Sequence, residues 1–359
     1  MTGAERLLAA CRGEPVDATP VWFMRQAGGS LPRYLALREH HGVLEIARTP
    51  ALCAEVTAGA ATVLETDGAI LFADVMLPVE AMGVELSLTA QGPLVERPIR
   101  TMADVEGLRQ VDVEADLGFV AEAIRLATAE LGDRAGVIGL AGGPFTIAAY
   151  LIEGGPSRDQ LTARRLAMGQ PAVWGALLDR ITAVTVDYVT AQVRAGAQVI
   201  QVFDSWAGNL SAADYERLVG PWARRILRAV RSAGAPVIHF AAAGANLLES
   251  LAIDADVVGV DATQSLAGAR GRLAAMPVQG NLDPARLAAD WPTVAAAVRT
   301  VLEGNGGRPG HIFNTGHAVP RDTAPARLRD IVRLVHERTA VSAAQPQGRS
   351  RARPTGVSA

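Results

Sequence analysis

The chain of 359 residues is 49% hydrophobic and carries a formal net charge of −3. This length and composition predict a sizeable apolar core in one or two domains. The small net charge excludes a global basic field that would attract nucleic acid or a membrane surface. All 34 basic residues are arginine, so no lysine is available for a Schiff base or an ordinary pyridoxal phosphate site.

The two cysteines, Cys11 and Cys53, are too few for a disulfide framework or a thiolate metal cluster, which fits a reducing compartment. The segment MTGAERLLAACRGEP (1–15) predicts a short amphipathic helix and lacks the uninterrupted apolar core of a secretory signal. No run of about 20 apolar residues appears, so no membrane-spanning helix is expected. We therefore expect a cytoplasmic protein that binds neither membranes nor nucleic acid.

Short apolar runs recur along the chain, and several are rich in valine and isoleucine. Each is too short for a buried helix, so we interpret them as strands buried on both faces. In chain order they are PVWFM (20–24), AILFAD (69–74), GVIGLAG (136–142), VIQVFDS (199–205), PVIHFA (236–241), VVGVDA (257–262), MPVQGNL (276–282) and HIFNTGH (311–317).

Helical patterns lie between these runs, for example over 115–132, 174–196 and 215–234, and the last two end at a glycine. Strands that alternate with helices predict a parallel sheet. Eight of them predict an α/β fold, a (β/α)8 TIM barrel, as a single domain over 1–340. The alternative is an open doubly wound sheet. The sequence contains neither the GxGxxG turn nor the P-loop motif that would support the nucleotide-binding form of that fold.

Two segments depart from this alternation. The stretch from Leu77 to Arg100 has room for an extra hairpin between the second strand and its helix. The end of the chain, 341–359, has low hydrophobicity and many Gly, Pro, Ser and Arg residues, so we expect it to be disordered.

In such a barrel, catalytic side chains lie where the strands end. The candidates at these positions are Arg25, Asp74, Gly142 to Pro144, Asp204, Ser205, His239, Asp261, Asn281, Asp283 and His317. They contain no HExxH motif, no metal spacing of three His or Cys residues and no G-x-S-x-G elbow. A nucleophilic pair of Ser205 and His317 is conceivable, as it is for any two such residues in a barrel. A carboxylate with arginines, hydroxyls and a histidine suits proton transfer on an anionic substrate without a cofactor.

Six segments resemble, in order, the uroporphyrinogen decarboxylase family over about Thr19 to His336. They are MRQAG with a following LPRY, LFADVMLPVEAMG, GGPFTIAAYLIEGG, FDSWAG, VQGNLDP and FNTGHAV. The resemblance implies a homodimeric barrel that uses neither cofactor nor metal. It implies removal of carbon dioxide from the four acetate side chains of uroporphyrinogen III, giving coproporphyrinogen III in the haem pathway.

The resemblance also implies the roles of three catalytic residues. Asp74 corresponds to the family aspartate that accepts pyrrole N–H bonds and stabilises a cationic intermediate. Arg25 corresponds to an arginine of the cleft that binds a carboxylate and assists proton delivery, although a guanidinium holds its proton too strongly to be a good general acid near neutral pH. Tyr150 corresponds to a tyrosine that hydrogen-bonds near the aspartate. On the residues alone, Asp74 fits a helix N-cap equally well, and Tyr150 fits a core tyrosine.

The same resemblance implies a wider set of substrate-binding residues. Ser205 and His317 correspond to residues that contact substrate carboxylates, although alone they would be an ordinary helix cap and a structural histidine. The remaining members are those of the flexible loop and one helix: Gln26, Ala27, Gly28, Gly29 and Arg38.

The chain departs from the family pattern at a few positions. Family members usually carry an arginine where this chain has Gly29, and its loss is expected to weaken binding by about 1.5–3 kcal/mol, one charged hydrogen bond. We expect Arg33 to supply a replacement. Ala262 and Ser265 replace a usual tryptophan and acid, and Ala318 replaces a glycine, which is expected to stiffen the loop of His317.

Two alternative functions are compatible with the fold. A zinc-dependent methyltransferase acting on corrinoids or thiols needs soft ligands, and Cys11 and Cys53 lie away from the strand ends. A tetrapyrrole-binding protein with weakened turnover is suggested by Gly29, whereas the presence of Arg25, Asp74 and Tyr150 favours activity.

Overall fold

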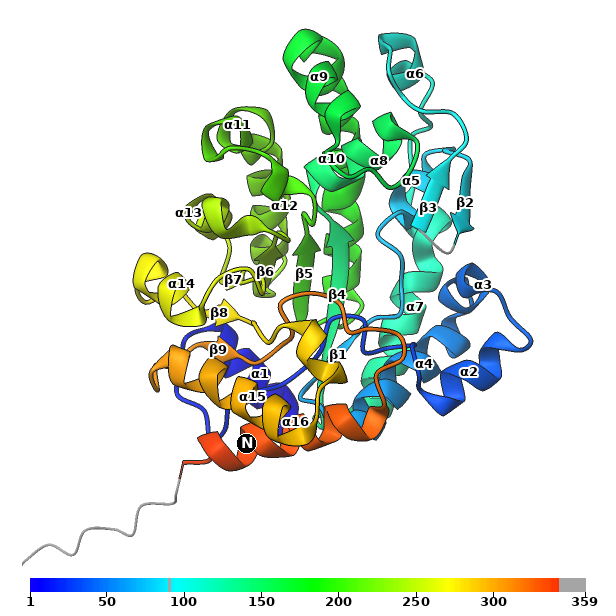
Figure 1. The fold of residues 1–359 in the computed structure, drawn as a ribbon. Helices are drawn as coiled ribbons and strands as arrows, with labels where there is room; N and C mark the ends of the chain where they lie inside the picture. Colours follow the sequence, from blue (N-terminus) through cyan, green and yellow to red (C-terminus); the bar gives the residue numbers. More distant parts are fainter. Residues whose placement is uncertain (90–91, 342–359) are drawn as a thin grey trace, which may run out of the picture.

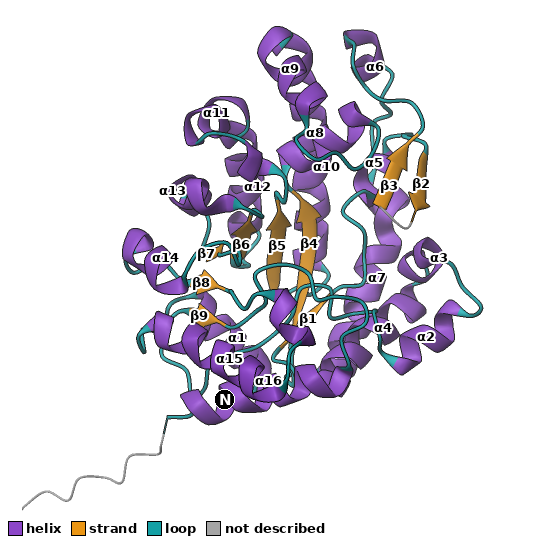
Figure 2. Cartoon of the chain, viewed as in Figure 1, coloured by secondary structure: helices purple, strands orange, loops and turns teal. Residues whose placement is uncertain are grey.

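A parallel sheet forms the centre of the computed structural model, which describes residues 1–89 and 92–341. The sheet has seven strands, and neighbours along it follow the chain order. Figures 1 and 2 show the strands curling around a common axis with helices on the outside, a TIM-barrel-like α/β arrangement. The strands are β1 (Gly68–Ile70), β4 (Gly136–Gly142), β5 (Val199–Phe203), β6 (Val237–Phe240), β7 (Val257–Gly259), β8 (Val278–Gln279) and β9 (His311–Ile312).

These strands coincide with seven of the eight predicted apolar runs, and their residues are buried because helices and the curled sheet cover both faces. Most of them end earlier than the apolar run. After β1, for example, the ladder continues only through the bond from Leu71 N–H to Ile138 O (2.9 Å), and Ala73 then turns back to Leu71. In these runs the last residues are therefore loop residues at the carboxyl end of the sheet, whereas β4 fills the whole of its run (Gly136–Gly142).

The run 20–24 was expected to be a full strand, and the structure gives it only a single parallel bridge, from Val21 to Phe313. Phe313 N–H donates to Pro20 O, and Asp67 N–H donates to Val21 O, both at 2.8 Å. These bonds place the segment between β9 and β1. It is short because Pro20 has no N–H to donate and the chain turns at Met24.

Helices connect the strands. They are α1 (Gly3–Cys11), α2 (Pro32–Arg38), α3 (Val43–Arg48), α4 (Pro50–Leu64), α5 (Leu77–Ala81), α6 (Met102–Glu106), α7 (Val113–Leu131), α8 (Pro144–Glu153), α9 (Leu161–Gly169), α10 (Pro171–Arg194), α11 (Ala212–Leu218), α12 (Gly220–Ser232), α13 (Leu248–Ala252), α14 (Leu266–Leu273), α15 (Trp291–Asn305) and α16 (Pro325–Thr339). Within the described part of the chain, none of them has both the length and the apolar character that crossing a bilayer requires.

Several helix predictions can be compared directly. The amphipathic helix at the start is α1, whose first turn is closed by a capping box between Thr2 and Glu5. Helices α7 and α10 match the patterns over 115–132 and 174–196. The pattern over 215–234 was interpreted as one helix and is two, α11 and α12. Pro221 explains the break, because a proline ring clashes with the carbonyl four residues earlier in a continuous helix.

The extra hairpin predicted between Leu77 and Arg100 is confirmed. Strand β2 (Leu86–Thr89) pairs antiparallel with β3 (Gly92–Val95), and Val95 N–H donates to Gly154 O at the end of α8 (2.9 Å). Figure 2 shows the arrows of β4 and β5 pointing toward α8 and the side on which this hairpin lies. The predicted disordered tail falls almost entirely outside the described residues. At their limit, Val341 N–H donates to Asp17 O (2.9 Å).

Asp67, just before β1, joins three parts of the fold from a nearly fully buried position. Its Oδ2 accepts from Val21 N–H (2.7 Å) and from His336 Nε2 of α16 (2.8 Å). Its Oδ1 accepts from Arg6 Nη1 of α1 (2.5 Å). His336, for which the sequence supported no functional role, therefore has a structural one.

We predict that Asp67→Ala lowers the free energy of unfolding by about 3–5 kcal/mol, because it leaves a half-buried guanidinium and a backbone N–H without their acceptor. Equilibrium urea denaturation measures this loss. Asp17→Ala is the matched control, since Asp17 accepts from the same Arg6 (2.7 Å) but its side chain is 42% exposed. The control is expected to lose less than about 1 kcal/mol, and equal losses in the two variants would contradict the assignment.

Candidate active site

Arg25 stands at the turn that follows the 20–24 segment. Its backbone has φ +62°, a left-handed conformation that costs most L-residues about 1–2 kcal/mol. Its side chain is exposed. The turn is anchored by the next residue, because Gln26 Nε2 donates to Gly68 O (2.7 Å) and Gln26 Oε1 accepts from Phe23 N–H (2.9 Å). The side chain of Gln26 is thus engaged inside the protein, and its contact with substrate stays a prediction.

The glycines of the same loop let it pack against the segment that follows β9. Gly28 (φ +109°) and Gly29 (φ +58°) both have left-handed backbones, and a Cβ on Gly29 would lie 3.4 Å from the carbonyl oxygen of Arg321. Ser30 Oγ donates to Thr323 O, and Val319 N–H donates to Met24 O (3.0 Å). A pocket of only about 20 Å³ lies between the two segments, and its lining includes Arg25, Gly28, Gly29, Ser30, Val319, Pro320 and Thr323.

Asp74 lies in the turn between β1 and α5 and is partly exposed. Burial raises the pKa of Asp74. The hydrogen bond from Met76 N–H (2.9 Å) and the positive charge of Arg25 lower it, and Glu80 raises it again. Asp74 therefore caps a turn, as its residue type alone allowed, and also faces the charge of Arg25.

Tyr150 belongs to α8, the helix after β4, and its ring packs on Trp206 with centroids 4.0 Å apart. Burial raises the pKa of Tyr150, the negative charge of Asp74 raises it further, and Arg25 lowers it. Within the described residues no hydrogen bond joins Tyr150 to Asp74. The hydroxyl lies 3.8 Å from where a Cβ on Gly92 would stand, so it points toward the hairpin.

His317 follows β9, and its side chain is exposed. The surrounding protein lowers the pKa of His317 by desolvation, the positive charge of Arg25 lowers it further, and Asp261 raises it. Arg25 thus acts electrostatically on Asp74, Tyr150 and His317, which follow different strands. The structure brings these four predicted site residues together at the carboxyl end of the sheet.

Other predicted residues lie differently. Ser205 is half-buried in the turn after β5, and its side chain does not cap the 3₁₀ helix that follows (Ala207–Asn209). Arg38 is exposed at the end of α2 and donates to His41 O. Arg33, the expected substitute for a cation at position 29, is 67% exposed and pairs with Glu55 of α4. Its guanidinium is therefore already engaged.

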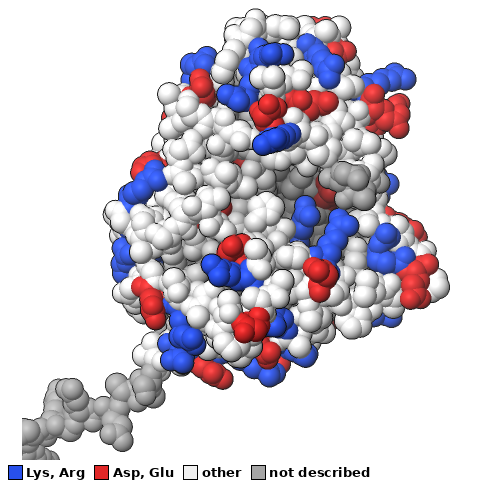
Figure 3. Space-filling view, in the orientation of Figure 1, with Lys and Arg blue, Asp and Glu red and all other residues white. Residues whose placement is uncertain are grey.

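The face that carries this site is hollowed. Figure 3 shows a hollow between the β2–β3 hairpin and the loop after β9, with basic side chains at its rim. Because the chain contains no lysine, these side chains are arginines. A concave surface with guanidinium groups at its edge suits a ligand that carries several carboxylates.

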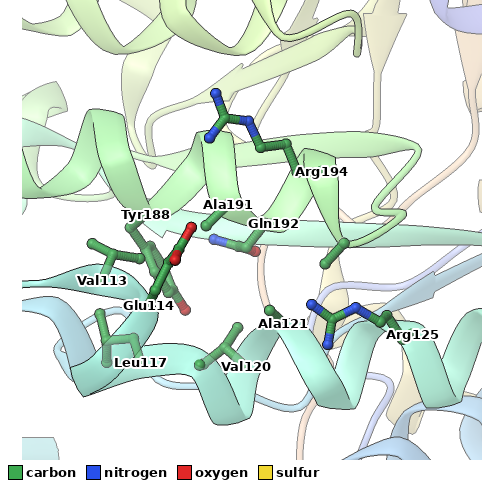
Figure 4. A pocket seen from close by; sticks show the side chains of 12 residues that line it. Val113, Glu114, Leu117, Val120, Ala121, Arg125, Tyr188, Ala191, Gln192 and Arg194 are labelled. Atoms are coloured by element: carbon green, nitrogen blue, oxygen red, sulfur yellow. The ribbon is translucent and has the colours of Figure 1, made fainter.

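A larger groove of about 310 Å³ lies elsewhere, between α7 and α10 (Figure 4). Its walls combine apolar residues with Glu114, Arg125 and Arg194, and all its lining residues belong to these two helices or to the residue after α10. It contains none of the predicted site residues, so its size alone does not make it the active site.

Asp204, a strand-end candidate in the sequence, contacts Thr146, and neither Thr146 nor Trp206 was predicted to belong to the site region. Asp204 Oδ1 accepts from the N–H (2.9 Å) and the hydroxyl (3.0 Å) of Thr146. Burial raises the pKa of Asp204 to about 6, and the bonds from Thr146 lower it. The motifs FDSWAG and GGPFT contained these residues, but no spacing in the sequence indicates that they touch.

The cysteines do not resemble a metal site. Both are buried, and Cys53 Sγ donates to Phe72 O (3.2 Å). Burial raises the pKa of Cys53 to about 12, which disfavours the thiolate that a zinc ion binds. No group of three His, Cys, Asp or Glu residues suited to a metal is found among the residues that the structure describes.

A family model described as uroporphyrinogen decarboxylase (URO-D) matches residues 2–338. The chain belongs to the uroporphyrinogen decarboxylase family. It is 45% identical over 333 residues to the uroporphyrinogen decarboxylase of Geobacter metallireducens, covering 92% of this chain and 98% of the relative. It is 46% identical over 332 residues to that of Syntrophotalea carbinolica, covering 92% and 96%.

Solved structures resemble the chain in fold. A methyltransferase from Methanosarcina mazei superposes with a TM-score of 0.80 at 21% identity, covering 94% of this chain and 99% of that one. A putative vitamin-B12-independent methionine synthase from Listeria monocytogenes gives a TM-score of 0.55 at 11% identity, covering 89% and 98%. At these identities the likeness concerns the fold alone and favours neither activity.

We predict that Arg25→Gly and Arg25→Ala both lose at least about 100-fold in kcat/KM, because both remove the cation that faces the other site residues. Their stabilities should differ, since alanine keeps the left-handed strain and glycine relieves it. The free energy of unfolding, measured by urea denaturation, should be about 1 kcal/mol higher for Arg25→Gly than for Arg25→Ala. Turnover at the wild-type rate in Arg25→Ala would show that Arg25 is not part of the active site.

Proposed function

We propose that this protein removes carbon dioxide from the four acetate side chains of uroporphyrinogen III, giving coproporphyrinogen III without a cofactor. The observation that carries the proposal is the placement of Arg25, Asp74, Tyr150 and His317 on loops and a helix at the carboxyl end of the sheet, with the other three in electrostatic range of Arg25. A family relationship over nearly the whole chain supports the same reaction.

Substrate binding follows from charge. The macrocycle carries eight carboxylates, and guanidinium binds carboxylate through two parallel hydrogen bonds without losing its own charge. Each well-made charge-assisted bond contributes about 1.5–3 kcal/mol. Arg25, Arg38, Ser205 and His317 are the proposed side-chain partners of these carboxylates. The loop from Gln26 to Gly29 contributes its backbone, and its left-handed glycines allow a close approach.

The chemistry needs an electron sink. Direct loss of carbon dioxide from a pyrrole acetate would leave an unstabilised carbanion. When the neighbouring ring carbon is protonated first, the ring becomes a cation that accepts the electron pair of the breaking C–C bond. The exocyclic carbon then takes a proton at its methylene, the ring carbon returns its proton, and a methyl group remains. Each acetate therefore consumes one proton and releases one carbon dioxide.

The site residues divide this work. Ionised Asp74 accepts pyrrole N–H bonds and stabilises the cationic ring in a desolvated cavity, where its charge acts more strongly than in water. Arg25 holds a reacting carboxylate close to the carbon that is protonated and assists delivery of the proton. Tyr150 donates a hydrogen bond beside Asp74 and helps to orient the macrocycle.

The finer architecture belongs to the same proposal. We infer a closed (β/α)8 barrel in a single domain over 1–340, with the segment 20–24 as the eighth strand, from its bonds to Phe313 and Asp67. A cytoplasmic location stays a prediction, based on the two unpaired cysteines. A homodimer is proposed from the family resemblance.

Anaerobic incubation with uroporphyrinogen III tests the reaction. Products with seven, six, five and finally four carboxylates are expected by chromatography, with carbon dioxide released in proportion. Asp74→Asn should lower kcat by at least about 100-fold, because the amide is isosteric and carries no charge. Binding of the macrocycle without carbon dioxide would instead support the tetrapyrrole-binding alternative, and full turnover by Asp74→Asn would refute the cation-stabilising role.

The pH dependence of kcat follows from the same carboxylate. The raised pKa of Asp74 means that its ionised, active form is lost at a higher pH than for an ordinary aspartate of about 4. The rate of the wild type should therefore fall as the pH decreases through this raised value. The residual kcat of Asp74→Asn should not show this fall at low pH. If the fall is unchanged in the variant, another group is responsible for it.

The oligomeric state is tested by sedimentation velocity of the full chain across a range of micromolar concentrations. A single boundary at twice the chain mass of 37.5 kDa is expected. A boundary at the monomer mass with full decarboxylase activity would contradict the proposed dimer.

A further inference from the structure

We propose that Asp204 is a positioning residue that fixes the position of the Tyr150 ring through Thr146 and Trp206. The inference rests on the proposed function, because Tyr150 is one of its catalytic residues. Asp204 itself is fully buried and does not reach the hollow, so its influence passes through the two residues between.

The first link joins β5 to α8. Asp204 follows β5 directly, and its N–H donates to Phe240 O (2.8 Å), which fixes its backbone to the neighbouring strand. Its carboxylate lies beneath the first turn of α8, where Oδ1 accepts two bonds from Thr146. A Cβ on Gly143 would lie only 2.4 Å from Asp204 Cβ, so a glycine is needed there for the carboxylate to approach.

The second link depends on the direction of the Thr146 hydroxyl. A hydroxyl has one proton to donate and lone pairs to accept with. The Thr146 hydroxyl donates its hydrogen bond to Asp204 Oδ1. Its lone pairs therefore point away from Asp204, and the oxygen accepts a hydrogen bond from Trp206 N–H (3.1 Å). The backbone of Trp206 is thereby tied to α8, although it belongs to the loop after β5.

The third link is the contact between the rings. Tyr150 is four residues after Thr146 in α8, so the two side chains lie on one face of the helix. The indole of Trp206 packs on the phenol of Tyr150 with a centroid distance of 4.0 Å and an angle of 31°. The bond at Thr146 and the ring contact at Tyr150 hold Trp206 at two points on the same helix.

The placement of the Asp204 carboxylate has an energetic cost. The second carboxylate oxygen of Asp204, Oδ2, is buried and has no hydrogen-bond partner among the described residues. A buried polar atom without a partner is destabilising. The link to the catalytic tyrosine gives this costly placement a function, since strained or unsatisfied groups persist where the site depends on them.

Thr146→Val tests the inference, because valine keeps the shape and removes the hydroxyl, and Thr146→Ser is the matched control. For Thr146→Val we expect kcat to fall about tenfold with KM changed less than about twofold, because the arginines that hold the substrate are untouched. Thr146→Ser should restore kcat to within about twofold of the wild type. Equal defects in both variants, or an unchanged kcat in Thr146→Val, would overturn the inference.

A double-mutant cycle separates this relay from a loss of general stability. In a Tyr150→Phe background, Thr146→Val should cost less than about twofold in kcat if it acts through the tyrosine. A full tenfold loss in both backgrounds would overturn the relay. If Thr146→Val does not fold, Trp206→Leu replaces it in the same cycle, since it removes the ring contact and keeps the bonds between Thr146 and Asp204.

A readout without turnover keeps this inference distinct from the proposed function. Ultraviolet difference titration, with Tyr150→Phe as reference, reports the ionisation of this one phenol. Burial raises the pKa of Tyr150, so a loosened Trp206 in Thr146→Val should lower it relative to wild type. A wild type that releases no carbon dioxide refutes the proposed function alone. An unchanged titration in Thr146→Val refutes the positioning alone.

Discussion

The charge of Arg25 beside the desolvated carboxylate of Asp74 is the interaction on which the site depends. Burial raises the pKa of Asp74, and the hydrogen bond from Met76 N–H together with the charge of Arg25 opposes this rise, which favours the anion that the proposed reaction needs. Arg25 itself stands in a left-handed turn, and Asp74 supplies a negative charge within its electrostatic range. The loops that follow the 20–24 segment and β1 hold these two groups within electrostatic range at the carboxyl end of the sheet, and the charge of Arg25 also acts on Tyr150 and His317.

The regular part of the fold could be read from the sequence, because apolar runs of valine and isoleucine alternating with helical patterns have few other solutions. Seven runs became strands, and the hairpin before Arg100 formed as expected. The run 20–24 was overestimated, since a proline at its start and a turn at its end leave room for only one bridge. The division of α11 from α12 shows that a single proline outweighs an otherwise continuous helical pattern.

The site was predictable only in part, for a physical reason. Arg25, Asp74, Tyr150 and His317 stand near strand ends or in recognisable motifs, and their juxtaposition follows from the curled parallel sheet. The contact of Asp204 with Thr146 joins residues 58 positions apart through the direction of one hydroxyl proton, which no periodicity encodes. The pairing of Arg33 with Glu55 likewise depends on how α2 packs on α4. Side-chain partners of this kind are set by tertiary packing and not by local pattern.

The hollow also decides how strongly the central carboxylate acts. At about 4 Å, a unit charge stabilises a cation by about 1 kcal/mol in bulk water and by about 4 kcal/mol at an effective dielectric constant of 20. Exclusion of water is therefore worth more than the addition of a second, solvated acid. The β2–β3 hairpin lies over this side of the sheet, and the hydroxyl of Tyr150 points toward its Gly92. Tyr150 lies in this wall, with its ring packed on Trp206. We therefore expect a well-positioned Tyr150 ring to help exclude water around Asp74, in addition to making the hydrogen bond proposed for its hydroxyl.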